Sequence, residues 1–395
     1  MKLHPRPPES LFPSLAVELV ELIAGHLEND GLLELRLTCR DLQKKTFNQF
    51  AHRFFASIKT DLSAESLGRI DALSRHQELR SYVQGLAFML QNGVGRGLVW
   101  NRHPWGQLSA PLEIEEIARL RDNLVHNFTN CRSFFIFCRY PEGYPDMSRV
   151  TISDAVSVFF ALVVDAQLPV TSFHLVYANK YSRTLVMDMR RMPKLLYRQP
   201  QFKMVWSNLL KLSLEQYLTL DNFGFLLELV LSAPNLQTLL LNLGSHDLAC
   251  EFMHELAESA SFPNMQELAL FRTSVQVPDL VKLLHGLRGN LTTLTLYHVS
   301  LSPDEDWMSV LKELSQSFAS LQSISLYYLW VTAPTKELLS FPDIQKASEL
   351  YGTPTQRLNV QYSENVQSPT VLGIEYSGSK MEYVLGLLQS FSKSP

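Results

Sequence analysis

Hydrophobic residues repeat with a regular period along residues 209–326. The pattern L-x-x-L-x-L, in which L is aliphatic and x is any residue, occurs five times there, and its central residues are 27, 29, 26 and 30 positions apart. Between the copies, apolar residues recur at three- and four-residue intervals. The short pattern predicts a strand and the longer spacing predicts an amphipathic helix, so strands and helices alternate. The central residues are Leu212, Leu239, Leu268, Leu294 and Ile324.

A strand and a helix that alternate with this period predict an α/β fold, a leucine-rich-repeat solenoid. In such a solenoid, parallel strands line the concave face and helices cover the convex face. Helices are expected at 223–231, 248–257, 278–287 and 307–318. Weaker strand patterns extend the repeat array in both directions, at 55–58, 83–88, 131–136, 170–175 and 371–376, with a closing helix at 381–391.

The first 50 residues follow a helical pattern only. Ser14 is the expected N-terminal cap of a first helix, and Asn29-Asp30-Gly31 ends that helix and begins a second. Each helix carries an apolar stripe, and two short helices cannot bury both stripes without the rest of the chain or a partner. The stripes consist of Leu15, Leu19, Leu22, Ile23 and Leu27, and of Leu32, Leu35, Cys39 and Leu42.

The segment from Leu15 to Arg40 resembles an F-box, most closely the version common in filamentous fungi. The resemblance rests on the Leu/Ile spacing and on the ending Leu-Arg-Leu-Thr-Cys-Arg at residues 35–40. The family pattern begins with Leu-Pro and ends near Val-Cys-Arg, whereas this chain has Ala16 and Thr38 at the proline and valine positions. Residues 54–83 also resemble the segment that follows the F-box in fungal F-box proteins with leucine-rich repeats.

The resemblance implies docking to the Skp adaptor of a cullin–RING ubiquitin ligase. Insertion of an apolar helix face into a groove is a common mode of recognition. The alternative is that the two helices only cap the repeat array, because terminal repeats need caps. Carried over from the family, the adaptor-binding residues are Leu15, Ala16, Leu19, Ile23, Leu27, Leu32 and Leu35.

Aromatic residues gather after the last strands of the array. Exposed tyrosine and tryptophan side chains supply contact area at low entropic cost and are enriched at binding hot spots. The alternative is that several of them pack under the next loop. The residues expected to bind substrate here are Tyr297, His298, Tyr327, Tyr328 and Trp330.

A basic segment at residues 180–203 is a second candidate substrate surface. Arginine guanidinium groups match the geometry of phosphate, so the segment predicts a site for an acidic or phosphorylated peptide. The alternative is a solvated helix and loop. The candidate residues are Arg190, Arg191 and Arg198, and Asp188 is the one acid among them.

A glycine-rich segment at residues 92–106 does not have the spacing of a dinucleotide-binding or Walker loop. We therefore expect a flexible loop that could touch a substrate, and we expect no nucleotide. Its glycines are Gly93, Gly95 and Gly97, and its large side chains are Trp100, Arg102 and Trp105.

Composition and motifs argue against several classes of protein. The net charge of −4 provides no global basic field to recruit nucleic acid. The four cysteines are too scattered for a disulfide framework. No signal-like region or bilayer-length apolar stretch occurs, so the expected location is the cytoplasm, the nucleus or both, without a membrane partner. No metal-binding, hydrolase or kinase motif occurs, so we expect neither catalysis nor a cofactor.

These patterns divide the chain into a helical module at 10–50 and a repeat array at 51–395, with insertions near 92–125, 180–205 and 329–368. The expected function is that of a substrate-recognition subunit of a Skp–cullin–F-box ubiquitin ligase. The array would hold a protein substrate while the cullin and the RING protein present activated ubiquitin, so catalysis comes from proximity. One alternative is an interaction scaffold unconnected with a ligase, and another is an enzyme built on the array.

Overall fold

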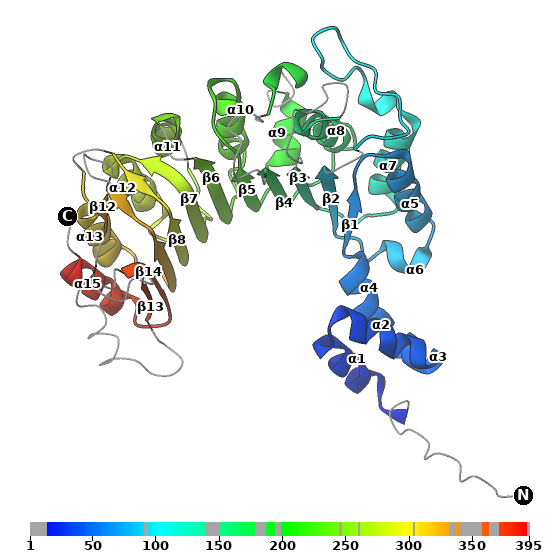
Figure 1. The fold of residues 1–395 in the computed structure, drawn as a ribbon, viewed down its shortest axis with the longest axis horizontal. Helices are drawn as coiled ribbons and strands as arrows, with labels where there is room; N and C mark the ends of the chain where they lie inside the picture. The colour runs from blue at the N-terminus through cyan, green and yellow to red at the C-terminus, as the bar shows by residue number, and fades with distance from the viewer. Residues whose placement is uncertain are drawn as a thin grey trace, which may run out of the picture.

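The structure is a computed structural model of the chain. It describes residues 14–90, 94–138, 150–177, 187–193, 199–244, 247–259, 261–302, 305–331, 337–339, 341, 358–362 and 371–392. An N-terminal group of helices leads into one long, open and mostly parallel sheet. The sheet curves into an arch, with its strands on the inside of the bend and helices on the outside (Figure 1).

The N-terminal module consists of four short helices. The break between the first two falls at Leu27 and Glu28, just before Asn29-Asp30-Gly31, which begins the second helix as predicted but lies inside it rather than in the break. The expected cap of the first helix is wrong. The first helix begins after Ala16, which offers no side-chain hydrogen bond, whereas Ser14 lies outside the cap position. Cys39 has an extended backbone and divides the second predicted helix into two. The helices are α1 (Val17–His26), α2 (Asn29–Thr38), α3 (Arg40–Lys45) and α4 (Phe47–Phe55).

The sheet places strands side by side in nearly their order along the chain. Every neighbouring pair from β1 to β10 is parallel. In spatial order the strands are β1 (Ser57–Thr60), β2 (Gly85–Leu90), β3 (Ser133–Cys138), β4 (Ser172–Tyr177), β5 (Lys211–Glu215), β6 (Thr238–Gly244), β7 (Glu267–Val275), β8 (Thr293–Tyr297), β10 (Ser323–Tyr327), β14 (Val371–Ser377) and β13 (Asn359–Tyr362).

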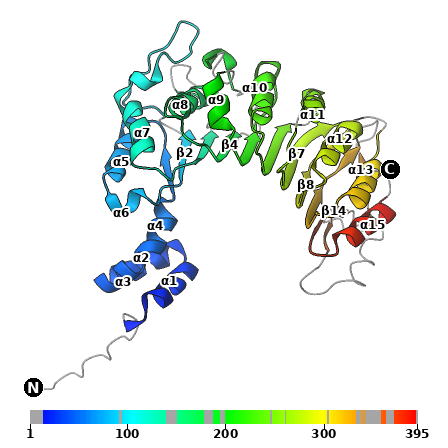
Figure 2. The ribbon, with the colours of Figure 1, turned by 180° about the vertical axis from the view of Figure 1, so that it is seen from behind.

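Helices cover the outer side of the arch, and the view from behind shows the same arrangement (Figure 2). The four helices predicted between residues 223 and 318 are present, and so is the closing helix. The helices are α5 (Ala64–Ser74), α6 (Gln77–Arg80), α7 (Glu115–His126), α8 (Ile152–Asp165), α9 (Pro200–Trp206), α10 (Leu220–Leu231), α11 (Asp247–Ser259), α12 (Val277–Leu287), α13 (Trp307–Ser317) and α15 (Met381–Phe391).

The repeated leucines form the layer between the sheet and the helices. The central residues of the five clear patterns align on adjacent strands and are at most 1% exposed. Because side chains alternate across a strand, the residues between them point to the inner face of the arch. Strand register therefore fixes which side chains a bound partner would meet.

Two features at the C-terminal end depart from the expected parallel array. Strand β14 pairs antiparallel with β10, and β13 pairs antiparallel with β14. A small second ladder lies beyond the main strands, where β9 (Ser300–Leu301) and β11 (Trp330–Val331) extend the end of β7 and β12 (Glu337–Leu338) joins them. The sequence patterns predicted the positions of the main strands but not the reversal, because hydrophobic alternation carries no strand direction.

Candidate binding surfaces

Large apolar side chains lie exposed on the N-terminal module. Leu19 and Leu22 in α1 are 50% and 61% exposed, and Leu37 in α2 is 86% exposed. Leu19 and Leu22 are three residues apart and Leu33 and Leu37 are four apart, so each pair shares one helix face. Val17 is exposed as well. Apolar surface of this kind marks interaction sites in folded proteins.

The opposite helix faces form a small core. Val20, Ala24, Leu32 and Ala51 are fully buried, and Leu42 is nearly so. Most of these side chains are small, so the module buries little apolar area for its length. Several of its larger aliphatic side chains, among them Leu19, Leu22 and Leu37, are left at the surface.

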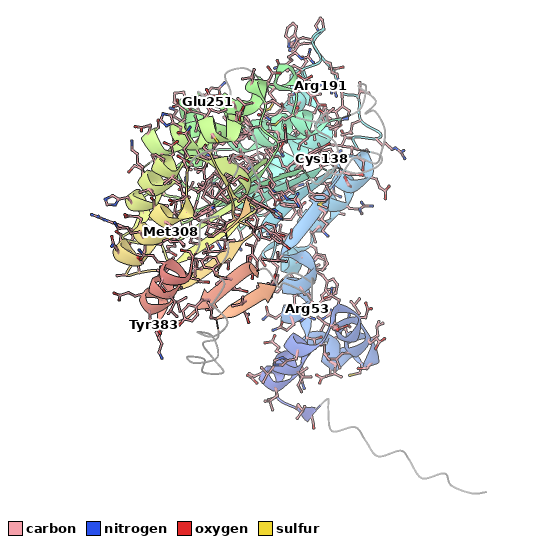
Figure 3. The ribbon with its side chains drawn as sticks, turned by 60° about the vertical axis from the view of Figure 1, so that its left-hand side comes forward. Arg53, Cys138, Arg191, Glu251, Met308 and Tyr383 are labelled. Carbon is pink, nitrogen blue, oxygen red and sulfur yellow. The ribbon has the colours of Figure 1, made fainter. Side chains whose placement is uncertain are left out.

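Basic side chains tie the module together through backbone carbonyl groups. Arg53 in α4 donates hydrogen bonds to the carbonyl groups of Leu27 and, at 3.1 Å, Gly25, which satisfies the C-terminal end of α1. Figure 3 shows Arg53 on the helix that joins the module to the sheet. Lys45 donates to the carbonyl group of Leu15 at 2.9 Å, and Arg36 lies 3.9 Å over the ring of Phe50. These contacts hold α1 and α2 in one orientation on α4.

The structure separates the predicted adaptor-binding residues by exposure. Leu19 and Ala16 are exposed, whereas Leu32 is fully buried and offers no side-chain atoms to a partner. Leu15, Ile23, Leu27 and Leu35 are partly buried. The prediction of adaptor contacts also left out four exposed residues, which a helical wheel with the small core residues on the inside would have indicated: Val17, Leu22, Leu33 and Leu37.

Four of the five predicted aromatic residues come together at the ends of β8 and β10. The rings of Tyr297 and Tyr327 have centroids 6.0 Å apart, and Phe271 at the end of the core part of β7 continues this row at 5.8 Å from Tyr297. The rings of His298 and Tyr328 stack at 4.4 Å with an interplanar angle of 5°. Tyr297 meets both stacked rings edge-on. We call these five residues the aromatic ladder, and all five are partly exposed.

Trp330 is not part of the ladder. It lies in β11, where its backbone N–H donates to the carbonyl group of Val299 and its carbonyl group accepts from the indole N–H of Trp307. The sequence placed Trp330 with the tyrosines because it is close to them along the chain. The small ladder of β9, β11 and β12 takes it to a different part of the sheet.

Left-handed backbone conformations underlie the aromatic ladder. Arg272 within β7 and His298 and Tyr328 just after β8 and β10 occupy equivalent positions on three neighbouring strands, and their φ angles are 44°, 54° and 50°. Non-glycine residues in this region cost about 1–3 kcal/mol each and persist only where the surroundings enforce them. The N–H of His298 donates to the carbonyl group of Tyr327, and that of Tyr328 donates to Leu372, both at 2.8 Å.

The ladder is close to neutral in charge. Partial burial and the nearby positive charge of Arg272 lower the pKa of His298, so its imidazole is uncharged at neutral pH. Burial raises the pKa of Tyr327, and Glu375, which accepts the Tyr327 hydroxyl hydrogen bond at 3.2 Å, raises it further. Burial also raises the pKa of Glu215, two strands away from Arg272.

The described part of the basic segment is committed to internal ion pairs. Arg191 is 4% exposed and contacts the buried carboxylate of Asp154 at 3.1 Å, at the top of the arch in Figure 3. Arg190 pairs with Asp188 at 3.0 Å. Arg198 lies outside the described residues. Neither described arginine therefore favours the expectation of a phosphate-binding surface.

The glycine-rich loop is anchored to the body of the sheet. Gly95 has a φ of 72°, and its carbonyl group accepts from the indole N–H of Trp100 at 2.9 Å. Arg102 binds both carboxylate oxygens of Asp154, at 2.7 and 2.9 Å. Trp105 is 58% exposed and stacks on His103. Of the large side chains predicted to touch a substrate, Trp105 is the most exposed, and Gly93 lies outside the described residues.

An open cleft of about 860 Å³ lies between the N-terminal module and the segment around α6. Arg36, Phe47 and Phe50 line one wall, and His76 and Tyr82 line the other. Within the described ranges, no group of His, Cys, Asp and Glu residues has the arrangement of a metal site. No helix in the same ranges is long and apolar enough to cross a membrane.

Comparison with known proteins assigns no family to the chain. No protein-family model matches it, and a search of curated proteins finds no significant match. The function is therefore inferred from the surfaces described above.

Proposed function

We propose that the protein is a substrate-recognition subunit of a Skp–cullin–F-box ubiquitin ligase. In this proposal residues 10–50 are an F-box that docks the Skp adaptor, which connects to the cullin and the RING protein. The curved sheet is a leucine-rich-repeat solenoid that holds a protein substrate on its inner face. The chain contributes no catalytic residues, and it acts in the cytoplasm, the nucleus or both.

The exposed leucines of the N-terminal module carry the proposal. A module that only capped the sheet would turn its apolar face towards the sheet. Instead, Leu19, Leu22 and Leu37 are at least half exposed and lie on helices that pack mainly within the module. An apolar helical surface of this kind fits the groove of a partner. The same exposure favours the ligase subunit over a scaffold in which the helices are a cap.

Binding of purified Skp adaptor to the full chain tests the proposal. Leu19→Asp and Leu37→Asp each place a charge in the proposed contact without removing a core side chain. If either leucine is a hot spot worth at least about 2 kcal/mol, its loss weakens adaptor binding at least about thirtyfold. Ile23→Asp is a third variant, and it needs a folding check because Ile23 is partly buried.

Leu220→Asp is the matched control, since Leu220 in α10 is 82% exposed and lies far along the sheet from the module. It should leave adaptor binding unchanged. Circular dichroism should show the same helix content in all four variants as in the wild type. The ligase proposal is wrong if the wild-type chain does not bind the adaptor. It is also wrong if the two leucine variants bind as tightly as the wild type.

A further inference from the structure

We propose that the aromatic ladder binds a proline-containing peptide segment in the polyproline II conformation, as part of the substrate that the proposed receptor holds. The inference rests on the proposed function and deepens it by naming the class of ligand. The ladder, composed of Phe271, Tyr297, His298, Tyr327 and Tyr328, lies across three adjacent parallel strands, at the ends of β8 and β10 and at the aligned position within β7. A peptide bound there would run across the strands.

The repeat of the sheet matches the repeat of the peptide. Neighbouring strands are about 4.8 Å apart, so alternate strands are about 9.6 Å apart. A polyproline II helix rises about 3.1 Å per residue, which gives about 9.3 Å for its three-residue turn. The backbone positions of Phe271 on β7 and Tyr327 on β10, which are aligned through Tyr297, therefore repeat with nearly the same period as prolines at positions i and i+3. Tyr297 on β8 lies between them.

The ladder also offers the hydrogen-bond donors that such a peptide needs. A polyproline II segment makes no internal hydrogen bonds, so its carbonyl groups accept from the receptor. Tyr327 already donates to Glu375. Within the part of the chain that the structure describes, no acceptor is paired with the hydroxyl groups of Tyr297 or Tyr328, although both rings are packed.

The charges around the ladder select an uncharged segment. Arg272 is exposed beside the ladder, but Glu375 and Glu267 lie on the same stretch of sheet, and His298 is neutral. A phosphorylated or strongly acidic peptide needs a surplus of cations, which the ladder does not provide. Aromatic-lined grooves that recognise proline-rich segments rely instead on ring contacts and on the low entropy of a preformed helix.

Backbone strain at the ladder is independent support for a binding role. Glycine would adopt the left-handed conformation without cost at positions 272, 298 and 328, yet the chain has arginine, histidine and tyrosine there. Strain that a simpler residue would remove is typical of sites where the side chain itself is needed. His298 and Tyr328, which both have this conformation, are also the two residues whose rings stack in parallel.

The test measures fluorescence anisotropy of fluorescein-labelled decaproline with the full chain. A glycine–serine peptide of the same length is the control probe. Tyr297→Ala should weaken decaproline binding at least about tenfold, as expected for a central hot spot. Tyr328→Phe keeps the ring and removes the hydroxyl group, so a smaller loss is expected. Tyr383→Ala changes an exposed tyrosine on the outer helix α15 (Figure 3) and should bind like the wild type.

His298→Gly separates structure from recognition. It relieves the left-handed strain, so the midpoint of urea unfolding should stay the same or rise, while decaproline binding falls at least about fivefold through loss of the stacked ring. A fall in stability together with unchanged binding would assign His298 to packing and contradict the proposal.

The proposal is overturned if decaproline binds no better than the glycine–serine peptide. It is equally overturned if Tyr297→Ala binds decaproline like the wild type, or if cellohexaose binds through the tyrosines and decaproline does not, which would indicate a glycan site. Adaptor binding distinguishes these failures from failure of the proposed function. The ladder variants should bind the Skp adaptor normally, whether or not decaproline binds.

Discussion

Asp154 organises the first half of the sheet, and replacing it with asparagine tests that role. Its carboxylate is 0% exposed and accepts hydrogen bonds from Arg102, in the glycine-rich loop, and Arg191, in the described part of the basic segment. It also accepts hydrogen bonds from the backbone N–H and the hydroxyl of Thr151, which completes the capping box of α8. One buried charge therefore joins three segments that are distant in sequence.

Asp154→Asn removes the charge but keeps the cap. The equivalent capping box of α10 already uses asparagine, where Asn222 accepts from the N–H of Thr219 at 2.8 Å. Removing one partner of a buried ion pair costs about 3–5 kcal/mol, because the other charge stays buried. Arg191 is 4% exposed and cannot regain water, whereas Arg102 is 17% exposed and partly can. We therefore expect a loss of about 3 kcal/mol in the free energy of unfolding.

Urea unfolding followed by tryptophan fluorescence measures this loss. Trp206 is fully buried and its ring lies 5.6 Å from Phe160 in α8, so it reports on the region that Asp154 holds. Asp122→Asn is the matched control, because the exposed pair of Asp122 and Arg121 should contribute less than about 1 kcal/mol. If Asp154→Asn unfolds within about 0.5 kcal/mol of the wild type, the buried cluster does not stabilise the fold as argued.

Three further outcomes can be measured. The hydrogen bond to Asp279 raises the pKa of His254 above 6.5, so its stabilisation is complete below pH 6.5 and is lost as pH rises through the folded-state pKa. Deprotonation of His254 should therefore lower the urea midpoint between pH 6 and pH 8, and His254→Gln should abolish this contribution. Burial raises the pKa of Cys131 to about 12, so iodoacetamide at pH 8 should modify it only after unfolding, as mass spectrometry would show. Gly373→Ala would place a Cβ atom 1.9 Å from Cδ1 of Tyr327, so it should displace that ring, alter the near-ultraviolet circular dichroism and weaken decaproline binding without affecting adaptor binding.

The sequence predicted the main strands and the helices between residues 220 and 317 because a buried periodic pattern leaves few alternatives. It did not reveal α8 as a separate helix, since the run from Ile152 to Val163 is buried on nearly every side and shows little amphipathic periodicity. Nor did it reveal the ion pairs of Asp154, because Arg102 and Arg191 reach it only through the tertiary fold.

The candidate surfaces were harder to predict than the fold. The sequence predicts an apolar stripe of Leu15, Leu19, Leu22, Ile23 and Leu27, but the helix turns Val20 and Ala24 inward. Leucine spacing alone does not show which side of a wide stripe the small core of the module accepts. The stacking of His298 on Tyr328 depends on left-handed backbone at residues other than glycine, and no local sequence signal predicts that conformation.

The junction between α4 and β1 is short and is held by hydrogen bonds to the sheet. A single residue, Ala56, separates the helix from the strand, and its carbonyl group accepts from the N–H groups of Gln84 and Gly85 at 2.8 and 2.9 Å. Tyr82 adds a hydrogen bond to Asn48 in α4. These hydrogen bonds set the direction in which the exposed leucines face relative to the inner face of the arch. One residue inserted into α4 would rotate the N-terminal module by about 100° relative to the sheet, because an α-helix turns once in 3.6 residues. Under the proposed function, such an insertion would leave both proposed binding surfaces intact but would move a bound substrate away from the point where the ligase delivers ubiquitin.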